Sequence, residues 1–306
     1  MVTVDKRLAV NIAGVDWVTP VTTASGTFGF GLEFQELADL SKLGAVTVKG
    51  LSLQPNAGNK GQRVVETPSG MLNSIGLENP GCDFFKKITL PMLKRKNIPV
   101  IANIYGHSLE EYEAVAKALD VDGVAMVEIN ISCPNVKEGG MVFGTNPKTA
   151  AEVVRTVKRA TGKPIITKLS PNVTDIVEMA LAVEEAGTDA ISMINTLLGT
   201  KIDIERQKPV LGNVFGGLSG PCIRPVAVRM VYQVSQKVHV PIIGMGGIMN
   251  ADDAIEFMLA GASAVAVGTA NFVEPGITDK IVDGMLDYIN RKGYQNISEI
   301  VGLAWK

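Results

Sequence analysis

The sequence predicts an α/β fold: a closed (β/α)₈ TIM barrel with long insertions over its C-terminal face. Eight short apolar runs, rich in Val, Ile and Ala, recur along the 306 residues and alternate with segments of helical period. Strands that are apolar on both faces and separated by helices belong to a parallel sheet covered on both sides. Eight of them in a chain of this length indicate a sheet that closes on itself, with a doubly wound open sheet as the alternative.

The predicted strands are bounded by Gly, Pro or Asn and lie at residues 20–24, 45–49, 100–103, 124–130, 165–169, 190–194, 242–244 and 264–268. Apolar residues at helical spacing predict intervening helices at 109–119, 148–160, 175–186, 225–236 and 251–259. Two connections, at about 50–98 and 197–223, are too long for simple crossovers. Both follow the carboxyl ends of strands, so we expect them over the active-site face. No linker interrupts the pattern, and residues 1–306 are predicted to form one domain.

The charge and cysteine content exclude several classes of protein. Lys and Arg total 29 against 31 Asp and Glu, without a long run of one sign, which argues against nucleic-acid binding. The three cysteines show no C-x-x-C spacing and there are two histidines, so neither disulfides nor a metal site is expected. No signal peptide and no apolar stretch of membrane-spanning length is visible. We therefore expect a cytoplasmic protein with a small-molecule ligand and no membrane association.

Glycines after the last two predicted strands indicate a phosphate site. The segment 244–248 (Gly-Met-Gly-Gly-Ile) follows the seventh strand, and 268–271 (Gly-Thr-Ala-Asn) follows the eighth. Glycine lets backbone N–H groups approach an anion, and these two loops commonly bind phosphate in barrels. Flavin mononucleotide (FMN), a sugar phosphate or a nucleotide would each fit, and plain tight turns are the alternative.

Polar residues stand at the ends of six predicted strands, where a buried sheet would otherwise stay apolar: Ser25, Lys49, Asn103, Asn130, Lys168 and the pair Asn195-Thr196. Groups that converge at one barrel mouth are typical of a site, although a single Asn or Ser can simply satisfy a turn. Each lysine would face an anionic or electron-accepting ligand unless it forms a salt bridge. Lys168 alone would also suit a Schiff-base aldolase.

The segment 130–135 (Asn-Ile-Ser-Cys-Pro-Asn) follows the fourth predicted strand. Cys133 lies in polar surroundings past the strand, where a thiolate could act as a base or nucleophile. Gly139, Gly140 and Gly144 in the following loop would let it move as a lid. Cys82 and Cys222 lie in the two long insertions and are not expected to be catalytic, and His239 is expected on the opposite face.

Seven motifs together resemble the class 1 dihydroorotate dehydrogenases over essentially the whole chain. They are Ala24-Ser25-Gly26 with Phe28-Gly29, Val48-Lys49-Gly50, Asn73-Ser74-Ile75-Gly76-Leu77-Glu78-Asn79, Asn130-Ile131-Ser132-Cys133-Pro134-Asn135, Lys168-Leu169-Ser170-Pro171-Asn172, Ile194-Asn195-Thr196 and Gly244-Met245-Gly246-Gly247. The resemblance implies a (β/α)₈ barrel that holds one FMN at its C-terminal mouth. It also implies oxidation of (S)-dihydroorotate to orotate in pyrimidine synthesis, with a proton removed from C5 and hydride passing from C6 to flavin N5.

The resemblance assigns a role to each matching residue. Cys133 matches the base. The substrate positions are Lys49, Asn73, Ser74, Ile75, Gly76, Leu77, Asn130, Asn135, Asn195 and Thr196. The FMN positions are Ser25, Lys49, Gly50, Asn103, Asn130, Lys168, Ile194, Gly220, Gly246, Gly247, Gly268 and Thr269. A lysine for the orotate carboxylate and asparagines for its amide-like edges are chemically suitable partners.

The electron acceptor separates two subclasses. Class 1A enzymes are homodimers that reduce fumarate, whereas class 1B enzymes use NAD⁺ through a second subunit that carries FAD and a [2Fe–2S] cluster. Residues 135–140, 196–199 and 216–221 look more like class 1B, which implies a homodimer of this chain within a heterotetramer. The chain lacks a cysteine cluster, so the NAD⁺ route would require that partner. The sequence shows no N-terminal amphipathic extension of the kind that would indicate a quinone-linked class 2 enzyme.

Overall fold

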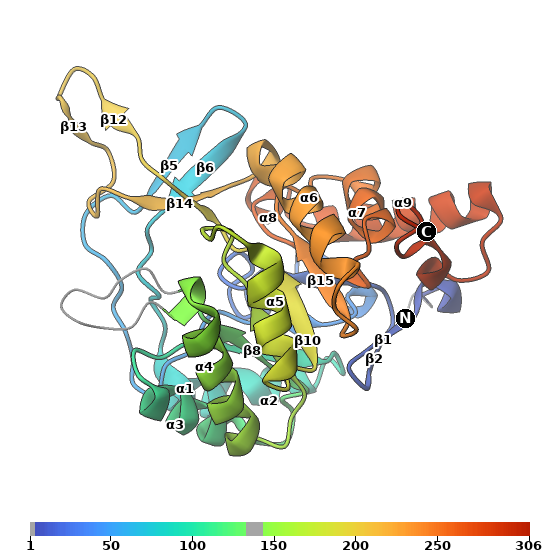
Figure 1. Cartoon of the computed structure of the whole chain (residues 1–306), viewed down its shortest axis with the longest axis horizontal. Coiled ribbons are helices and arrows are strands. Elements are labelled where there is room, and N and C mark those ends of the chain that lie inside the picture. Colours follow the sequence, from blue (N-terminus) through green and yellow to red (C-terminus); the bar gives the residue numbers. More distant parts are fainter. Residues whose placement is uncertain (1–3, 133–142) are drawn as a thin grey trace.

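A computed structural model describes residues 4–132 and 143–306 and has an eight-stranded parallel sheet at its centre (Figure 1). The strands follow the order β3-β16-β15-β10-β9-β8-β7-β4. Their bounds are Val21–Thr23 (β3), Val46–Thr47 (β4), Val100–Ile104 (β7), Met126–Asn130 (β8), Ile165–Lys168 (β9), Ala190–Met193 (β10), Ile242–Met245 (β15) and Ala264–Val267 (β16). Each lies within two residues of the predicted bounds, which confirms all eight predicted strands.

The two outer strands of this sheet meet and bring it close to a complete barrel. The backbone N–H of Gly44, just before β4, donates to Val21 O at 2.9 Å. Thr22 Oγ1 on β3 donates to Ala45 O at 2.8 Å. Thr23 Oγ1 accepts from Thr47 N at 3.2 Å. These bonds join β3 to β4, so the predicted (β/α)₈ barrel is confirmed over the open sheet.

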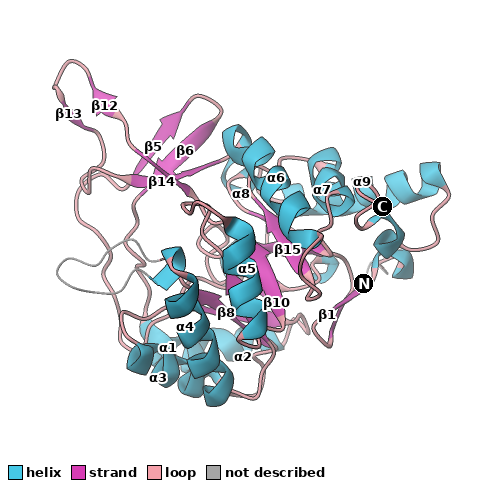
Figure 2. Ribbon diagram, in the orientation of Figure 1, coloured by secondary structure: helices cyan, strands magenta, loops and turns pink. Residues whose placement is uncertain are grey.

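Helices surround the strands, as Figure 2 shows. Their bounds are Gly81–Phe84 (α1), Leu90–Lys94 (α2), Leu109–Leu119 (α3), Pro147–Ala160 (α4), Ile176–Glu185 (α5), Arg224–Ser235 (α6), Ala251–Leu259 (α7), Ala270–Val273 (α8) and Ile277–Lys292 (α9). The five predicted helices correspond to α3–α7 within one residue at each end. The long α9 was not predicted, although Ile277, Ile281, Met285 and Ile289 give it a buried helical stripe.

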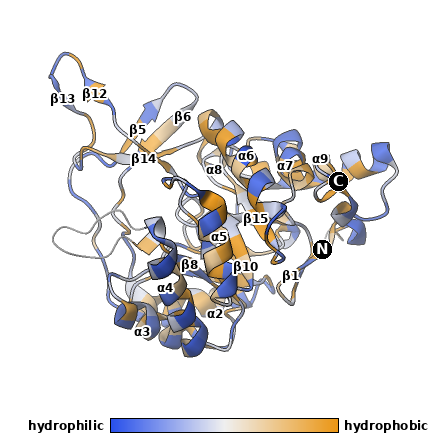
Figure 3. Cartoon of the chain, in the orientation of Figure 1, coloured by the Kyte–Doolittle hydropathy of each residue, from blue (hydrophilic) through white to orange (hydrophobic). Residues whose placement is uncertain are grey.

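Side-chain caps explain where four helices begin. Ser108, Asn146, Asp175 and Asn250 precede α3, α4, α5 and α7, and each side chain accepts a hydrogen bond from a backbone N–H of the first turn. The helices then bury one face against the barrel. Figure 3 shows β10 and β15 as apolar, whereas helices α4 and α5 carry both hydrophilic and hydrophobic residues.

A separate apolar cluster fills the barrel interior at the amino-terminal ends of the strands. It includes Ala45, Ile101, Met126 and Ile166 from the beginnings of successive strands. An N-terminal hairpin of β1 (Val10–Ile12) and β2 (Val15–Trp17) adds Ile12 and Trp17 to the same cluster, both essentially inaccessible to solvent. This hairpin was not predicted. It covers the amino-terminal end of the barrel, so the other end is the one left open for a ligand.

The two long insertions combine into one antiparallel sheet over that open end. Its order is β11-β14-β6-β5, with bounds Val64–Thr67 (β5), Gly70–Asn73 (β6), Leu197–Gly199 (β11) and Gly216–Ser219 (β14). The pairing of β6 with β14 sets Leu72 opposite Leu218 and joins segments far apart in the sequence. A small hairpin of β12 (Ile202–Asp203) and β13 (Lys208–Pro209) projects beyond it (Figure 1). The predicted position is confirmed for these strands, whereas α1 and α2 of the first insertion lie beside the barrel, where α1 contacts α3.

No helix in residues 4–132 or 143–306 has both the length and the apolar composition needed to cross a membrane.

Candidate active site

A cavity of about 670 Å³ lies between the carboxyl ends of the barrel strands and the antiparallel sheet of the insertions. The predicted site residues that the structure describes all line it: Ser25, Lys49, Gly50, Asn73, Ser74, Ile75, Gly76, Leu77, Asn103, Asn130, Lys168, Ile194, Asn195, Thr196, Gly220, Gly246, Gly247, Gly268 and Thr269. Their spread from residue 25 to residue 269 makes this convergence a property of the fold, because the carboxyl ends of parallel barrel strands share one face.

The predicted base Cys133 and the predicted substrate residue Asn135 lie outside the described residues. Residues on either side of the segment 133–142 are placed, and Ser132, Gly144 and Thr145 line the cavity. A Cβ added to Gly144 would lie 2.5 Å from Ile131 O, so the residues flanking this segment meet closely. Cys133 is therefore covalently adjacent to a residue of the cavity wall.

Glycines form a narrow cradle at one end of the cavity. Gly220, Gly246 and Gly247 have φ values of +101°, +126° and +80°, a backbone region that favours glycine. A Cβ on Gly247 would lie 2.8 Å from Gly220 O and 2.7 Å from Arg224 Cβ. Thr269 Oγ1 and Ser219 Oγ are 2.8 Å apart, which ties the loop after β16 to the insertion sheet. The three glycine-containing loops thus lie together, as a phosphate cradle requires.

The side chain of Arg224, which lies next to Gly247, already forms ion pairs with two carboxylates. The Arg224 guanidinium binds Asp253, and its Nε lies 3.2 Å from Glu256 Oε2. Asp253 also accepts from Met249 N at 2.8 Å, which fixes the start of α7. An anion in the cradle would consequently be met by glycine N–H groups and the beginning of α6.

The two predicted lysines face the cavity without a carboxylate partner. Lys168 is 6% exposed, and within the described part of the chain no carboxylate oxygen lies within 4 Å of Lys49 Nζ or Lys168 Nζ. Burial lowers the pKa of the Lys49 ammonium; the Glu78 carboxylate opposes that shift and the Arg63 guanidinium adds to it. The salt-bridge alternative is not observed, so both cations are available to a ligand.

The buried carboxylate of Glu128 contacts Asn103 of the cavity lining and forms the floor of the site. Glu128 on β8 is 3% exposed. Its Oε2 accepts from Asn103 Nδ2 on β7 at 2.5 Å, and its Oε1 accepts from Ser192 Oγ on β10 at 2.7 Å. Asn103 Oδ1 is buried and has no partner among the described residues. The floor therefore presents one unsatisfied acceptor next to the cavity.

Amide side chains organise the wall formed by β8 and β10. Asn130 Oδ1 accepts from Ser132 N at 3.1 Å and from Asn195 Nδ2 at 3.4 Å. Asn195 Oδ1 accepts from Thr196 N at 2.8 Å. Asn172 Nδ2 donates to Thr196 O at 3.0 Å, so it holds the chain that leaves β10. These contacts preset the directions of the predicted substrate amides.

Hydrogen bonds from Asn59 and Tyr105 hold the segment 73–77 in place. Asn59 Nδ2 donates to Ser74 Oγ at 3.1 Å, and Asn59 N donates to Ile75 O at 2.9 Å. Tyr105 OH donates to Leu77 O at 3.2 Å. Because the supports contact this strand-to-loop segment at several points, its backbone groups are fixed before a ligand arrives.

Sequence reasoning missed three contributors to this site. Glu128 stands out in the sequence as a single acid within an apolar strand, which was a usable signal. Asn59 lies in an insertion without a recognisable pattern, so its role depends on the tertiary structure. Asn172 stands in a motif used for the family resemblance, but no role was assigned to it.

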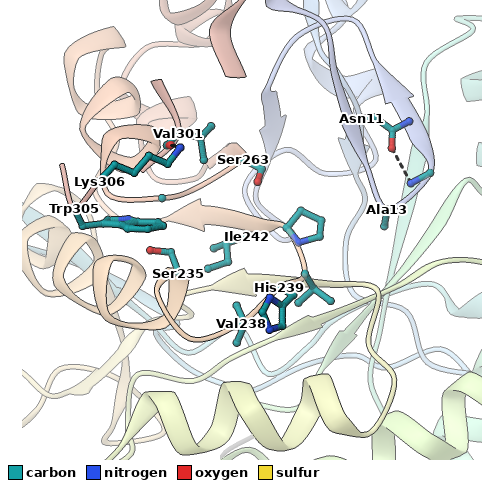
Figure 4. A pocket seen from close by; sticks show the side chains of 14 residues that line it. Asn11, Ala13, Ser235, Val238, His239, Ile242, Ser263, Val301, Trp305 and Lys306 are labelled. Atoms are coloured by element: carbon teal, nitrogen blue, oxygen red, sulfur yellow. Dashed lines mark hydrogen bonds between the residues drawn. The ribbon is translucent and has the colours of Figure 1, made fainter. Parts of the chain in front are cut away.

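The remaining candidates lie elsewhere. His239 lines a hollow of about 470 Å³ at the opposite end of the barrel, near Trp305 and Lys306, as expected (Figure 4). Cys82 is buried, and burial raises the pKa of its thiol to about 11. Cys222 is exposed. Within residues 4–132 and 143–306, no cluster of three His, Cys, Asp or Glu side chains could hold a metal ion.

Comparisons with known proteins identify the family. Residues 7–289 match the family model described as dihydroorotate dehydrogenase. A protein from Desulforamulus reducens, named dihydroorotate dehydrogenase B (NAD(+)), catalytic subunit, is 58% identical over 299 residues, which cover 97% of this chain and 98% of that protein. Proteins with the same name from Geotalea daltonii and Geobacter sulfurreducens are 57% and 55% identical over 296 residues, covering 96% of this chain and 97% of each relative. The chain therefore belongs to the dihydroorotate dehydrogenase family, within which it is similar to the B-type catalytic subunits.

Proposed function

We propose that this chain is the catalytic subunit of a class 1B dihydroorotate dehydrogenase, which oxidises (S)-dihydroorotate to orotate in pyrimidine synthesis. The observation that carries the proposal is the convergence of 19 predicted site residues on one cavity in a chain that belongs to this family. A lysine aldolase or a phosphate-binding isomerase would have no evident use for the amide-rich wall beside Lys168.

The cavity has features that suit FMN, with one FMN per chain. Gly220 and Gly247 line the cavity, and the lack of a Cβ lets their backbone segments pack closely, which suits a cradle of N–H groups around a phosphate. The unpaired Asn103 Oδ1 offers an acceptor for a ring N–H. The residues that would hold FMN are those of the family pattern: Ser25, Lys49, Gly50, Asn103, Asn130, Lys168, Ile194, Gly220, Gly246, Gly247, Gly268 and Thr269. When bound, FMN supplies the hydride acceptor.

The substrate would be held by the amides and by one cation. Lys49 would attract the carboxylate, and Asn73, Asn130 and Asn195 would meet the ring's carbonyl and N–H groups. The backbone of residues 73–77, supported by Asn59, would add further contacts. Lys168 lines the cavity wall, and its ammonium would stabilise the negative charge that develops during the reaction.

Cys133 would act as the base. Its thiolate would take the proton from C5; with bound FMN supplying the acceptor for the hydride from C6, the C5–C6 double bond would form. A thiol is better suited than a hydroxyl because a larger fraction is ionised at neutral pH. The position of Ser132 in the cavity wall and the match of residues 130–135 to the family motif support this role. The predicted lid with Gly139 and Gly140 lies outside the described residues.

The electrons would leave to NAD⁺ through a partner subunit that carries FAD and a [2Fe–2S] cluster. The name of the relatives, NAD(+) catalytic subunit, supports this route. We further propose a homodimer of this chain within a heterotetramer in the cytoplasm, with residues 1–306 acting as one domain. The purified chain alone should reduce NAD⁺ poorly, and addition of the electron-transfer subunit should restore the activity; rapid NAD⁺ reduction by the chain alone would contradict the partner requirement.

An anaerobic absorbance spectrum of the purified chain, before and after addition of dihydroorotate, tests the reaction. The expected result is a flavin spectrum that bleaches on addition of the substrate. Protein that retains FMN and does not bleach would reject dihydroorotate as the substrate. Failure to take up FMN would reject the flavin assignment and leave the aldolase or isomerase interpretation. Fumarate, tested as an oxidant of the reduced chain, distinguishes class 1A from class 1B.

A further inference from the structure

Glu128 connects three strands under the cavity, and none of the family motifs assigns it a role. It extends from β8 into the barrel, where its two carboxylate oxygens accept from Asn103 on β7 and Ser192 on β10. A buried carboxylate is costly unless its oxygens are hydrogen-bonded, and here both are. The carboxylate accepts hydrogen bonds only, so it determines which end of each neighbouring group points towards it.

This restriction fixes the amide of Asn103. If the amide were reversed, Asn103 Oδ1 would face Glu128 Oε2, and two acceptors would meet without a proton between them. In the observed orientation Nδ2 points to Glu128, and Oδ1 is left buried without a partner in the described residues. A Cβ added to Gly50 would lie 2.8 Å from Asn103 Oδ1, so the glycine keeps this oxygen uncovered.

We propose that Glu128 is a positioning residue that holds Asn103 as a hydrogen-bond acceptor for the ring N–H of the bound FMN. The inference rests on the proposed function. The oxidised isoalloxazine ring has one ring N–H, at N3, between two carbonyl groups. An asparagine that was free to turn could serve this edge either as a donor to a carbonyl or as an acceptor of the N–H. Glu128 selects the acceptor, and Ser192 occupies the other carboxylate oxygen.

A donor–acceptor swap separates the two possible roles of Asn103. In Asn103→Asp, two carboxylates face each other across the floor, and we expect FMN to bind at least tenfold more weakly. In the double variant Asn103→Asp with Glu128→Gln, the new amide donates to the introduced carboxylate and leaves the second oxygen of that carboxylate as an acceptor towards the cavity. The dissociation constant of FMN should then return to within about threefold of wild type.

The same two variants can also give a result that overturns the proposal. If Asn103 donates to FMN, an aspartate cannot replace it, and the double variant would bind FMN as weakly as Asn103→Asp; that result overturns the proposal. Ser192→Ala is the matched control, because it removes the other donor to Glu128 and leaves the Asn103 contact. Its FMN dissociation constant should stay within about twofold of wild type, and a loss as large as that of Asn103→Asp would indicate a general structural role. Thermal unfolding of each apoprotein verifies folding.

A second measurement uses the wild-type chain and needs no variant to fold. With ¹⁵N-labelled FMN, the N3 signal of the bound cofactor should show a hydrogen-bonded N–H that is protected from solvent exchange. A rapidly exchanging N3 proton in the wild-type complex would also overturn the proposal. Wild-type protein that does not bind FMN would instead refute the proposed function itself, whereas FMN binding and bleaching with a failed rescue would refute only the role of Glu128.

Discussion

Replacement of Gly247 by alanine tests the cradle most directly, because the structure shows how an alanine would affect both the backbone conformation and the contacts at this position. The φ of Gly247 is +80°, and this backbone region costs a non-glycine residue about 1–2 kcal/mol. The new Cβ would also lie 2.8 Å from Gly220 O and 2.7 Å from Arg224 Cβ. One neighbour is a backbone oxygen and the other is a Cβ atom, so neither can move without its backbone. The shift of the chain should cost about 1–3 kcal/mol of stability.

Gly293 provides the matched control for this substitution. Its φ is +78°, and a Cβ added there would meet no atom within 4 Å. Gly293→Ala should therefore lose only the conformational cost of about 1–2 kcal/mol, whereas Gly247→Ala should lose about 2–5 kcal/mol in total. Denaturant unfolding of the two apoproteins measures this difference in the free energy of unfolding.

The functional consequence is measured by fluorescence titration with FMN. We expect Gly247→Ala to raise the FMN dissociation constant at least tenfold, because the shift of the chain around Gly220 and Arg224 displaces the backbone N–H groups proposed to bind the phosphate, and Gly293→Ala to leave it unchanged. Equal losses of stability in the two variants would refute the inferred crowding. A destabilised Gly247→Ala protein with wild-type FMN affinity would refute the phosphate site.

Three other predictions concern the lysine and the cysteines. Cys133→Ala should keep FMN and orotate binding but slow flavin reduction by dihydroorotate at least about 100-fold in single-turnover experiments; near wild-type reduction would reject its role as base. Because burial lowers the pKa of Lys49, orotate affinity should decline as the pH rises through that lowered pKa, and Lys49→Arg, which stays charged, should show no such decline in titrations from about pH 7 to 10. Burial raises the pKa of Cys82 to about 11, so at about pH 8 a thiol reagent should label the exposed Cys222 while Cys82 stays unmodified, as peptide mapping would show.

The barrel strands could be predicted because their sequences record the environment on both faces. Runs such as 165–169 are apolar at most positions, which suits a strand covered by helices outside and side chains inside. The site residues could be predicted for a related reason, since many of them are polar groups at the end of such a run. The N-terminal hairpin was missed because its turn uses Ala13 at φ +50° beside Gly14, where asparagine or aspartate would have been the usual signal.

The sheet over the cavity could not be predicted from local pattern. Its central pairing, Leu72 with Leu218, joins positions far apart in the chain that only the tertiary structure brings together. Asn59 supports Ser74 and Ile75 for the same reason, through contacts that depend on how the first insertion folds back on itself. The motif 73–77 could be associated with a ligand, but the group that holds it in place could not.

The side chains inside the barrel change from apolar to polar towards the cavity, and this change is visible in the sequence between residues two positions apart. Asn103, Glu128 and Lys168 each stand two positions after a residue of the apolar cluster at the amino-terminal ends of the strands, namely Ile101, Met126 and Ile166. Alternate residues of a strand share a face, so these polar groups form the next layer towards the cavity. An apolar layer at this level would be as stable or more stable, because burial of unpaired or charged groups is costly. Stability therefore does not explain the polar layer. The proposed ligand above it would, since Asn103 Oδ1 has no hydrogen-bond partner and Lys168 no carboxylate partner among the described residues.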